Sequence, residues 1–259
     1  MTKEEQYYRE ISTKRFKITF HENDTTKVKC PICLKSDAYL SWDNLQLEET
    51  QESVKYRSHE EWEPDWPEYD YSATYECVEC KQRIRSLGTA AHSYHEYYDP
   101  HTGCHDADEY KIFTPQFFLP SLIIFEPPQQ CPKEVKKVLF DSFKLAFCDI
   151  PSAANKVRVA LEVLISLEIP EPDLVNKSLH ERIPLLEVKY PNIHGIKDIS
   201  LAIKWIGNAG SHEENGVPEF ALKFAYEAFE AILREIYETK KSTIGEMSKL
   251  VNTLKGKFN

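Results

Sequence analysis

The chain has 259 residues, of which 41% are apolar and 29% are charged. This composition favours a packed globular core and argues against an intrinsically disordered chain. The first residues hold no apolar segment of the kind that a secretory signal needs. The longest apolar stretch, 117–125, contains a proline and is too short to span a membrane. We therefore expect a soluble, cytoplasmic protein.

Negative charge is concentrated in the first half of the sequence. Residues 1–120 hold 14 Lys and Arg against 23 Asp and Glu, which gives a net charge of −9. Residues 121–259 hold 18 against 19 and are almost neutral. An acidic half repels a phosphate backbone, so it is poorly suited to nonspecific nucleic-acid binding and better suited to a protein partner. The C-terminal half can still offer a local basic site.

Short aromatic and β-branched runs characterise the region before residue 120, and they predict short antiparallel strands. The runs are 16–20, 38–42, 72–78, 82–87 and 110–113. The segment 60–71 is acidic, aromatic and interrupted by prolines, which predicts a loop. Four further prolines between 115 and 128 indicate a linker.

A helical pattern begins after residue 130. Predicted helices start near Pro132, Pro151, Ser178, Ile196 and Pro218, and a polar last helix starts near Thr243. Ser178 and Glu181 have the spacing of a capping box. The fold class is therefore α+β. An antiparallel, zinc-ribbon-like β domain (1–120) precedes an α-helical bundle (121–259).

Two Cys-x-x-Cys pairs predict a structural zinc site formed by Cys30, Cys33, Cys77 and Cys80. Each pair follows a strand-like run, and two such turns complete a tetrahedral shell of four thiolates. The 43 residues between the pairs are a long insertion, but loop length adds little entropy cost. A closed shell makes the zinc structural rather than catalytic. The other three cysteines are predicted to be ordinary thiols: Cys104, Cys131 and Cys148.

Histidines and acidic residues gather between positions 92 and 108, where metal binding and a solvated loop are both possible. The spacing matches no established metal site, so we favour a solvated loop. The residues are His92, His95, His101, Cys104, His105, Asp106 and Asp108.

Two polar groups interrupt the amphipathic pattern of the helical half. Arg158 and Glu162 are four residues apart, the spacing of an intrahelical ion pair. Lys204, Asn208 and His212 form one stripe if their segment is helical.

Gly207 and Gly210 lie within this stripe and lower its helix propensity. The run therefore either ends a helix or lets another group approach the backbone. Composition alone favours a helix C-terminus, with His212 as a surface residue.

The helical half resembles the HEPN superfamily, in the bacterial branch found in restriction and defence proteins. The resemblance covers roughly residues 120–240. It rests on the runs 153–162 (AANKVRVALE), 179–183 (LHERI) and 206–212 (IGNAGSH). Many HEPN domains are metal-independent ribonucleases whose signature is Arg, a polar residue, and then His. Asn208 and His212 match this signature. Gly207 stands at the Arg position, and this branch usually carries its basic residue three positions earlier, where this chain has Lys204.

The resemblance implies RNA cleavage in which the 2′-hydroxyl is the nucleophile. His212 would act as base or acid, while Arg158 and Lys204 stabilise the phosphate. Asn208 would orient His212 or the phosphate, and Glu162 would orient Arg158. Such sites usually form across a homodimer. The products would carry a 2′,3′-cyclic phosphate and a 5′-hydroxyl.

A zinc finger followed by this helical domain also resembles zinc-finger ribonucleases of bacterial phage defence. That resemblance implies a latent toxin whose zinc-containing half binds a phage component. Two alternatives are a non-catalytic HEPN-like dimerisation or sensing scaffold and a zinc-ribbon regulator that binds nucleic acid. Four aromatic residues would suit a protein interface if they are exposed rather than packed over the sheet: Trp62, Trp66, Tyr69 and Tyr71.

Overall fold

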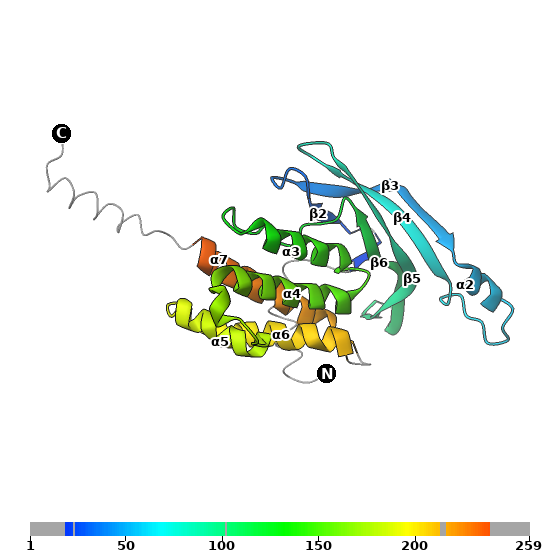
Figure 1. Cartoon of the computed structure of the whole chain (residues 1–259). Coiled ribbons are helices and arrows are strands. Elements are labelled where there is room, and N and C mark those ends of the chain that lie inside the picture. The colour runs from blue at the N-terminus through cyan, green and yellow to red at the C-terminus, as the bar shows by residue number, and fades with distance from the viewer. Residues whose placement is uncertain (1–18, 23, 102, 213–215, 239–259) are drawn as a thin grey trace.

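A computed structural model describes residues 19–22, 24–101, 103–212 and 216–238, except for the side chains of Asp99, Glu171, Ser211 and His212. The chain is a mixed α and β protein in which an antiparallel sheet precedes a group of helices (Figure 1). The elements are β1 (Phe20–His21), β2 (Lys27–Lys29), β3 (Asp37–Glu49), α2 (Gln51–Tyr56), β4 (Glu68–Cys77), β5 (Arg83–Asp99), β6 (Cys104–Leu119), α3 (Lys133–Leu145), α4 (Ile150–Glu168), η1 (Glu171–Asp173), α5 (Leu179–Lys189), α6 (Ile196–His212) and α7 (Glu219–Tyr237). The predicted helix at Thr243 lies outside the described residues.

In the described part of the chain, six strands form one curled sheet in the order β1-β6-β5-β4-β3-β2. Successive strands from β2 to β6 are neighbours joined by hairpins or by the longer connection through α2. All described strand pairs are antiparallel. Two register shifts, between Ser41 and Gln46 and between Leu87 and Gly88, interrupt the ladders. Bulges of this kind increase the local twist and bend of a sheet.

Alternation of buried and exposed residues builds the inner face of the sheet. Along β4, Tyr71, Ala73, Tyr75 and Cys77 are buried while the residues between them are not. Strands β3 to β6 are longer than the sequence predicted, while most of the predicted strand 16–20 lies outside the described residues. The predicted loop 60–71 ends early because β4 begins at Glu68. Of the two alternatives for the four aromatic residues, Tyr71 takes the packed one, at 3% exposure in the sheet core, whereas Trp66 is 42% exposed.

The helical half begins each helix close to where the sequence predicted. The Asp149 side chain accepts a hydrogen bond from the Ser152 amide at the start of α4, and Ser178 and Glu181 form the predicted capping box. The α4 helix is central and packs on α3, α6 and α7. Its buried stripe includes Val157, Leu161 and Leu164. The α6 helix does not end at its glycines but continues to His212.

The helices gather at one end of the sheet, and α2 lies at the other (Figure 1). Leu122 in the linker and Phe147 after α3 pack against the small core around Tyr75. The rings of Phe118 and Phe147 meet edge to face with centroids 4.9 Å apart. Among the described helices, none has the length and apolar character needed to cross a bilayer.

Candidate metal centre and helix crossing

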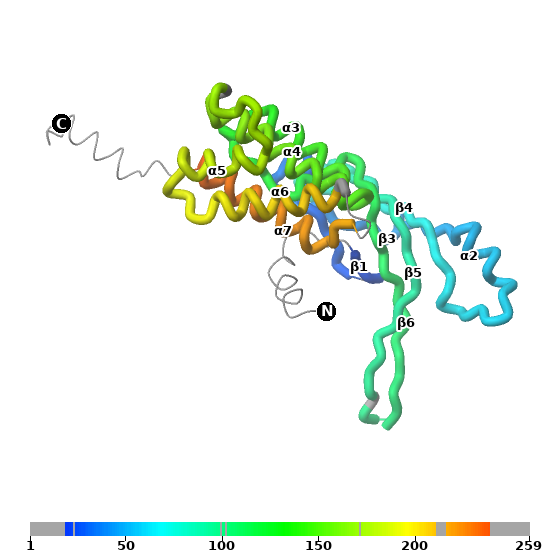
Figure 2. The backbone as a smooth tube through the Cα atoms, turned by 60° about the horizontal axis from the view of Figure 1, so that its bottom comes forward, coloured from blue at the N-terminus to red at the C-terminus, as the bar shows by residue number. Residues whose placement is uncertain are grey.

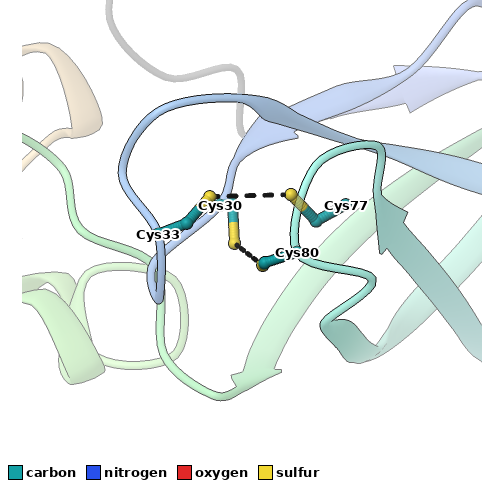
Figure 3. A group of neighbouring side chains, drawn as sticks. All are labelled: Cys30, Cys33, Cys77 and Cys80. Atoms are coloured by element: carbon teal, nitrogen blue, oxygen red, sulfur yellow. Dashed lines mark hydrogen bonds between the residues drawn. The ribbon is translucent and has the colours of Figure 1, made fainter.

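The four predicted ligands come together at one end of the sheet (Figure 3). The β2–β3 hairpin turns through Cys30 and Cys33, and the β4–β5 hairpin turns through Cys77 and Cys80. Because β3 pairs with β4, the two turns are neighbours. The long insertion between the pairs therefore forms β3, α2 and β4, and it leaves the two turns side by side.

The two turns have the same backbone geometry. The Leu34 amide donates to the Cys30 carbonyl oxygen, and the Lys81 amide donates to that of Cys77, each at 3.1 Å. Leu34 and Lys81, each following the second cysteine of its pair, have positive φ angles of 54° and 58°. This conformation is costly for a non-glycine residue and persists where surrounding contacts require it. Here it turns both sulfurs of a pair toward one point.

The sulfur positions fit a four-coordinate zinc ion. All four Sγ atoms lie within 4.8 Å of one another. The Sγ atoms of Cys30 and Cys80 are 3.6 Å apart, and those of Cys33 and Cys77 are 3.7 Å apart. Zn–S bonds of about 2.3 Å in a tetrahedron require S···S distances of about 3.8 Å. Cys30 and Cys77 are fully buried, as expected of ligands that form part of a core.

The pKa values of the Cys33 and Cys80 thiols lie far apart. Backbone amides of Lys35 and Ser36 lower the pKa of the Cys33 thiol to about 6. The Gln82 amide lowers the pKa of Cys80, but desolvation and the three neighbouring sulfurs together raise it to about 11. Four adjacent thiolates repel one another, and a divalent cation relieves that repulsion. The arrangement is thus a possible metal site.

The remaining cysteines lie elsewhere. Cys104 and Cys148 are exposed, and Cys131 is buried, which raises the pKa of its thiol to about 11. Most of the histidine-rich segment is solvent-exposed as predicted, with His92 the main exception, but it is not a loop, because it belongs to the β5–β6 hairpin. Within the described residues, the four-cysteine group is the one cluster with metal-ligand spacing.

The second candidate region is the crossing of α4 and α6, where two glycines allow close contact. A Cβ atom on Gly207 would lie 2.4 Å from the Cβ atom of Arg158 and 3.1 Å from the Ala154 carbonyl oxygen. A Cβ atom on Gly210 would lie 2.3 Å from the Pro151 carbonyl oxygen. The two helices therefore run antiparallel and nearly touch. Both predicted explanations hold: the run ends α6, whose last residue is His212, and its glycines let the α4 backbone approach.

Arg158 lies directly at this crossing. Its Nε donates to the Asn155 side chain at 3.1 Å, and its Nη1 donates to Glu162 at 2.9 Å. The predicted intrahelical pair of Arg158 and Glu162 is therefore present, with the Arg158 side chain 22% exposed. The two partners engage different nitrogens of the guanidinium, and no partner of Nη2 is described. The N–H groups of Nη2 can donate to an anion.

Of the predicted stripe of Lys204, Asn208 and His212 on α6, the structure describes the side chains of the first two near the crossing. Lys204 and Asn208 are half-buried and flank Gly207 on α6. The Lys204 ammonium lies over the Trp205 ring, 3.4 Å from its centroid. His212 is the last residue of α6, one turn beyond Asn208, and its side chain lies outside the described part of the structure.

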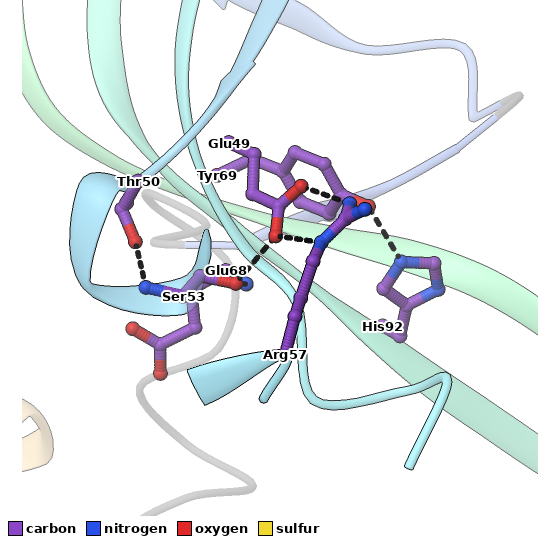
Figure 4. Close-up of polar contacts among 7 residues, drawn as sticks. All are labelled: Glu49, Thr50, Ser53, Arg57, Glu68, Tyr69 and His92. Carbon is purple, nitrogen blue, oxygen red and sulfur yellow. Dashed lines mark hydrogen bonds and ion pairs between the residues drawn. The ribbon is translucent and has the colours of Figure 1, made fainter. Parts of the chain in front are cut away.

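A polar network at the far end of the sheet was missed by sequence reasoning (Figure 4). Tyr69 Oη lies 3.1 Å from His92 Nε2, and His92 Nδ1 pairs with Glu109. Nearby, Glu49 at the end of β3 pairs with Arg57 just after α2. The signal for the hairpin that carries His92 and Glu109 was the Asp99–Gly103 sequence (DPHTG), whose Asp, Pro and Gly are typical of a turn.

Comparisons with known proteins give two family matches, each over less than half of the chain. Residues 18–118 match a domain of unknown function (DUF8608), and residues 141–256 match a second domain of unknown function (DUF4145). No curated protein matches the chain. No solved structure matches it either.

Proposed function

We propose that the chain is a latent, metal-independent endoribonuclease of bacterial antiphage defence. In this proposal the helical half is a HEPN-like ribonuclease domain, and the zinc-ribbon-like N-terminal half receives an activating phage protein. The strongest support is the glycine crossing, because it sets Arg158 of α4 against the turn of α6 that carries Lys204 and Asn208. These groups are separated by 46 or more residues in sequence yet lie on neighbouring helices.

The proposed chemistry needs a base, an acid and a cation beside the scissile phosphate. His212 removes the proton from the RNA 2′-hydroxyl, and a second His212 across a homodimer protonates the leaving 5′-oxygen. Arg158 and Lys204 stabilise the negative charge that builds on the phosphate. Asn208 orients His212 or the phosphate. Glu162 orients Arg158, a role that their 2.9 Å contact supports.

The glycine at position 207 is compatible with this proposal. A larger residue there would separate α4 from α6, so an arginine at this position would displace Arg158 from the crossing. Arg158 can instead supply the guanidinium from the neighbouring helix. Unlike a lysine, it can hold a phosphate with two parallel hydrogen bonds.

The metal's proposed role is structural. Zn²⁺ bound by Cys30, Cys33, Cys77 and Cys80 would have a closed thiolate shell, which leaves no open position for substrate. Its proposed contribution is to fix the two hairpin turns and, through Phe118 and Phe147, the end of the sheet that contacts the helices.

One observation favours the non-catalytic scaffold as a second candidate. The Lys204 ammonium lies against Trp205, so this cation is already engaged. In the scaffold reading, α6 holds its polar residues for dimerisation or sensing rather than for cleavage.

The test is RNA integrity in bacteria that express wild type, His212→Ala or His194→Ala, before and after challenge with a phage panel. His194 is an exposed histidine of the same half and provides the matched control. We expect wild type and His194→Ala to cleave RNA after infection. We expect His212→Ala to cleave at least about 100-fold more slowly, since general acid–base catalysis contributes about that much or more.

Product ends provide a second readout. Cleavage by the proposed route leaves ends that a ligase specific for 2′,3′-cyclic phosphate joins. Metal independence is tested separately: we expect addition of EDTA to the purified active protein to leave the cleavage rate unchanged. Equal phage protection by wild type and His212→Ala, with RNA intact in both, would reject the ribonuclease and favour the scaffold.

A further inference from the structure

The outer part of the β5–β6 hairpin stands apart from the rest of the sheet. Pairing of β4 with β5 ends at Ala91, whereas β5 and β6 continue to pair from His92↔Lys111 out to Asp99↔Cys104. We call these two segments, 92–99 and 104–111, the outer ribbon. At about 3.3 Å per residue, eight paired positions extend about 25 Å. Figure 2 shows the ribbon projecting away from the molecule.

The outer ribbon has no core of its own in the single chain. Most of its described residues are exposed on both faces, including Tyr94 (43%), Tyr97 (36%) and Tyr98 (57%). A two-stranded hairpin with neither face covered is marginally stable in water. Tyrosines that bury little in the monomer are the residue type that dominates binding hot spots.

Apart from Lys111 at its base, the outer ribbon carries acidic side chains and neither Lys nor Arg. No Lys or Arg occurs between Arg85 and Lys111, and Lys111 lies at the base beside Glu22. The acidic residues of the ribbon are Glu96, Asp99, Asp106, Asp108 and Glu109.

The tyrosines lie within this negative field. The negative charges of Asp108 and Asp106 raise the pKa of Tyr97. Burial raises the pKa of Tyr94, and Glu109 together with Asp65 and Glu63 of the β3–β4 connection raises it further. The β3–β4 connection therefore adds the carboxylates of Glu63 and Asp65 to the acidic surface around Tyr94.

The base of the ribbon is held in place. The His92 side chain is only 11% exposed and bridges Tyr69 of β4 to Glu109 of β6. Figure 4 shows the Tyr69–His92 contact and the Glu49–Arg57 pair, which links the end of β3 to the residue after α2. A surface presented in a fixed direction loses little entropy on binding. The ribbon thus combines exposed rings, one sign of charge and a braced base.

We propose that the outer ribbon is the docking surface for a basic protein, whose Arg and Lys side chains lie against its tyrosine rings and carboxylates. Cations are attracted to aromatic faces and to carboxylates alike. Nucleic acid is the disfavoured occupant because its phosphates carry the same sign as the ribbon. The proposal rests on the proposed function in one respect, which is that this partner is the activator.

The first test measures binding without RNA cleavage. A random 12-residue peptide library is selected on the full-length chain and counter-selected on the charge-reversed variant Asp106→Lys/Asp108→Lys. The matched control is Asp43→Lys/Glu48→Lys, which makes the same charge change at exposed positions on β3. A third variant, Tyr97→Ala/Tyr98→Ala, removes two rings without altering charge, so misfolding of the charge-reversed chain does not end the test.

We expect the selected peptides to be rich in Arg and Lys. Their Kd should weaken at least about tenfold in the charge-reversed and ring-deleted variants, less than about twofold in the control, and further as NaCl rises from about 50 to about 300 mM. Neutral or acidic peptides, or equal binding to all variants, would overturn the proposal. So would ribbon-dependent binding of a 20-nucleotide single-stranded RNA.

The second test separates the ribbon from the ribonuclease. If the peptide results hold but wild type and His212→Ala protect equally against phage, the ribbon stands as a docking surface and the ribonuclease is rejected. If His212→Ala loses protection while Asp106→Lys/Asp108→Lys keeps it, the ribonuclease stands, and the ribbon is rejected as the surface that the activator uses.

Discussion

The two halves of the chain are stabilised in different ways. In the helical half, one large apolar cluster connects all of the long helices, with Val157, Leu161 and Phe229 at its centre. In the sheet half, the described buried residues form two small clusters, and Cys30 and Cys77 are members of one of them. Two of the four cysteines of the candidate metal site are thus part of the small core around Tyr75.

This difference indicates where each half is vulnerable. A domain with a small core commonly needs a metal or disulfides for stability, whereas a continuous apolar core does not. We infer that metal binding and folding are linked in the sheet half and independent in the helical half.

The largest expected effect is that of Cys77→Ser, which would remove one ligand and one buried member of the small core. Structural zinc contributes about 10 kcal/mol or more to the folding of small zinc domains. We expect zinc content, measured by mass spectrometry, to fall from one ion per chain to nearly none. We also expect circular dichroism to lose the sheet signal while most of the helical signal remains.

The matched control for this change is Cys148→Ser, because Cys148 is exposed and lies outside the cluster. It should keep both its zinc and its sheet. If Cys77→Ser retained zinc and folded normally, folding of the sheet half would not depend on metal binding at this cluster.

Gly207→Ala tests the helical half at its closest contact. The added methyl group would meet Arg158 Cβ at 2.4 Å. Because Arg158 Cβ cannot swing away, the overpacking cost lies at the upper end of its usual range, about 3 kcal/mol, and the better helix propensity of alanine offsets about 1 kcal/mol of that. We expect the free energy of unfolding to fall by about 2 kcal/mol in urea titrations that follow the helical signal.

Asn208→Ala is the control for this substitution, because it alters the adjacent residue but adds no atoms against α4. A stable Gly207→Ala variant with unchanged ribonuclease activity would show that the crossing tolerates separation, and the catalytic argument built on it would fail.

The four-cysteine cluster was predictable from sequence because each Cys-x-x-Cys turn is local and its spacing is typical of metal sites. The helix starts were predictable for the same reason, since capping residues such as Ser178 act within one turn. The crossing was not fully predictable. Gly207 and Gly210 reduce helix propensity locally, and only the packing of α4 shows that they serve an uninterrupted helix.

The outer ribbon was missed for a different reason. Its tyrosines and histidines occur at even and odd positions alike, so the segment lacks the alternation of a half-buried strand and resembles a solvated loop. Its strand structure comes from the backbone pairing of β5 with β6, which the composition of the segment does not indicate.

Glu168→Gln tests how the ends of three helices are joined. Glu168 accepts hydrogen bonds from Tyr190 after α5 and from Tyr237 at the end of α7, the latter at 2.5 Å. Loss of the charged acceptor should lower the free energy of unfolding by about 1.5 kcal/mol at pH 7.

The pH dependence of this effect has a definite sign. Burial raises the pKa of Glu168, but hydrogen bonds from Lys189, Tyr190 and Tyr237 outweigh it and hold the pKa below the ordinary 4.5. The contribution is therefore complete well above pH 4.5 and is lost as the pH falls through the lower folded value. Urea titrations at pH 7 and pH 3.5 should show the wild-type advantage shrinking. An advantage that grew on acidification would contradict this account.

The smallest effect is expected in the outer ribbon, which belongs to neither core. Tyr98→Ala should change the free energy of unfolding by less than about 0.5 kcal/mol, because the ring is 57% exposed. Tyr71→Phe provides the contrast within the same sheet, since it would remove a buried 2.9 Å hydrogen bond to Ser86 and should cost about 1 kcal/mol. Thermal denaturation of both variants beside wild type measures the difference. If Tyr98→Ala lowered the free energy of unfolding more than Tyr71→Phe, the exposed rings of the ribbon would stabilise the monomer itself. That result would argue against their being available to a partner.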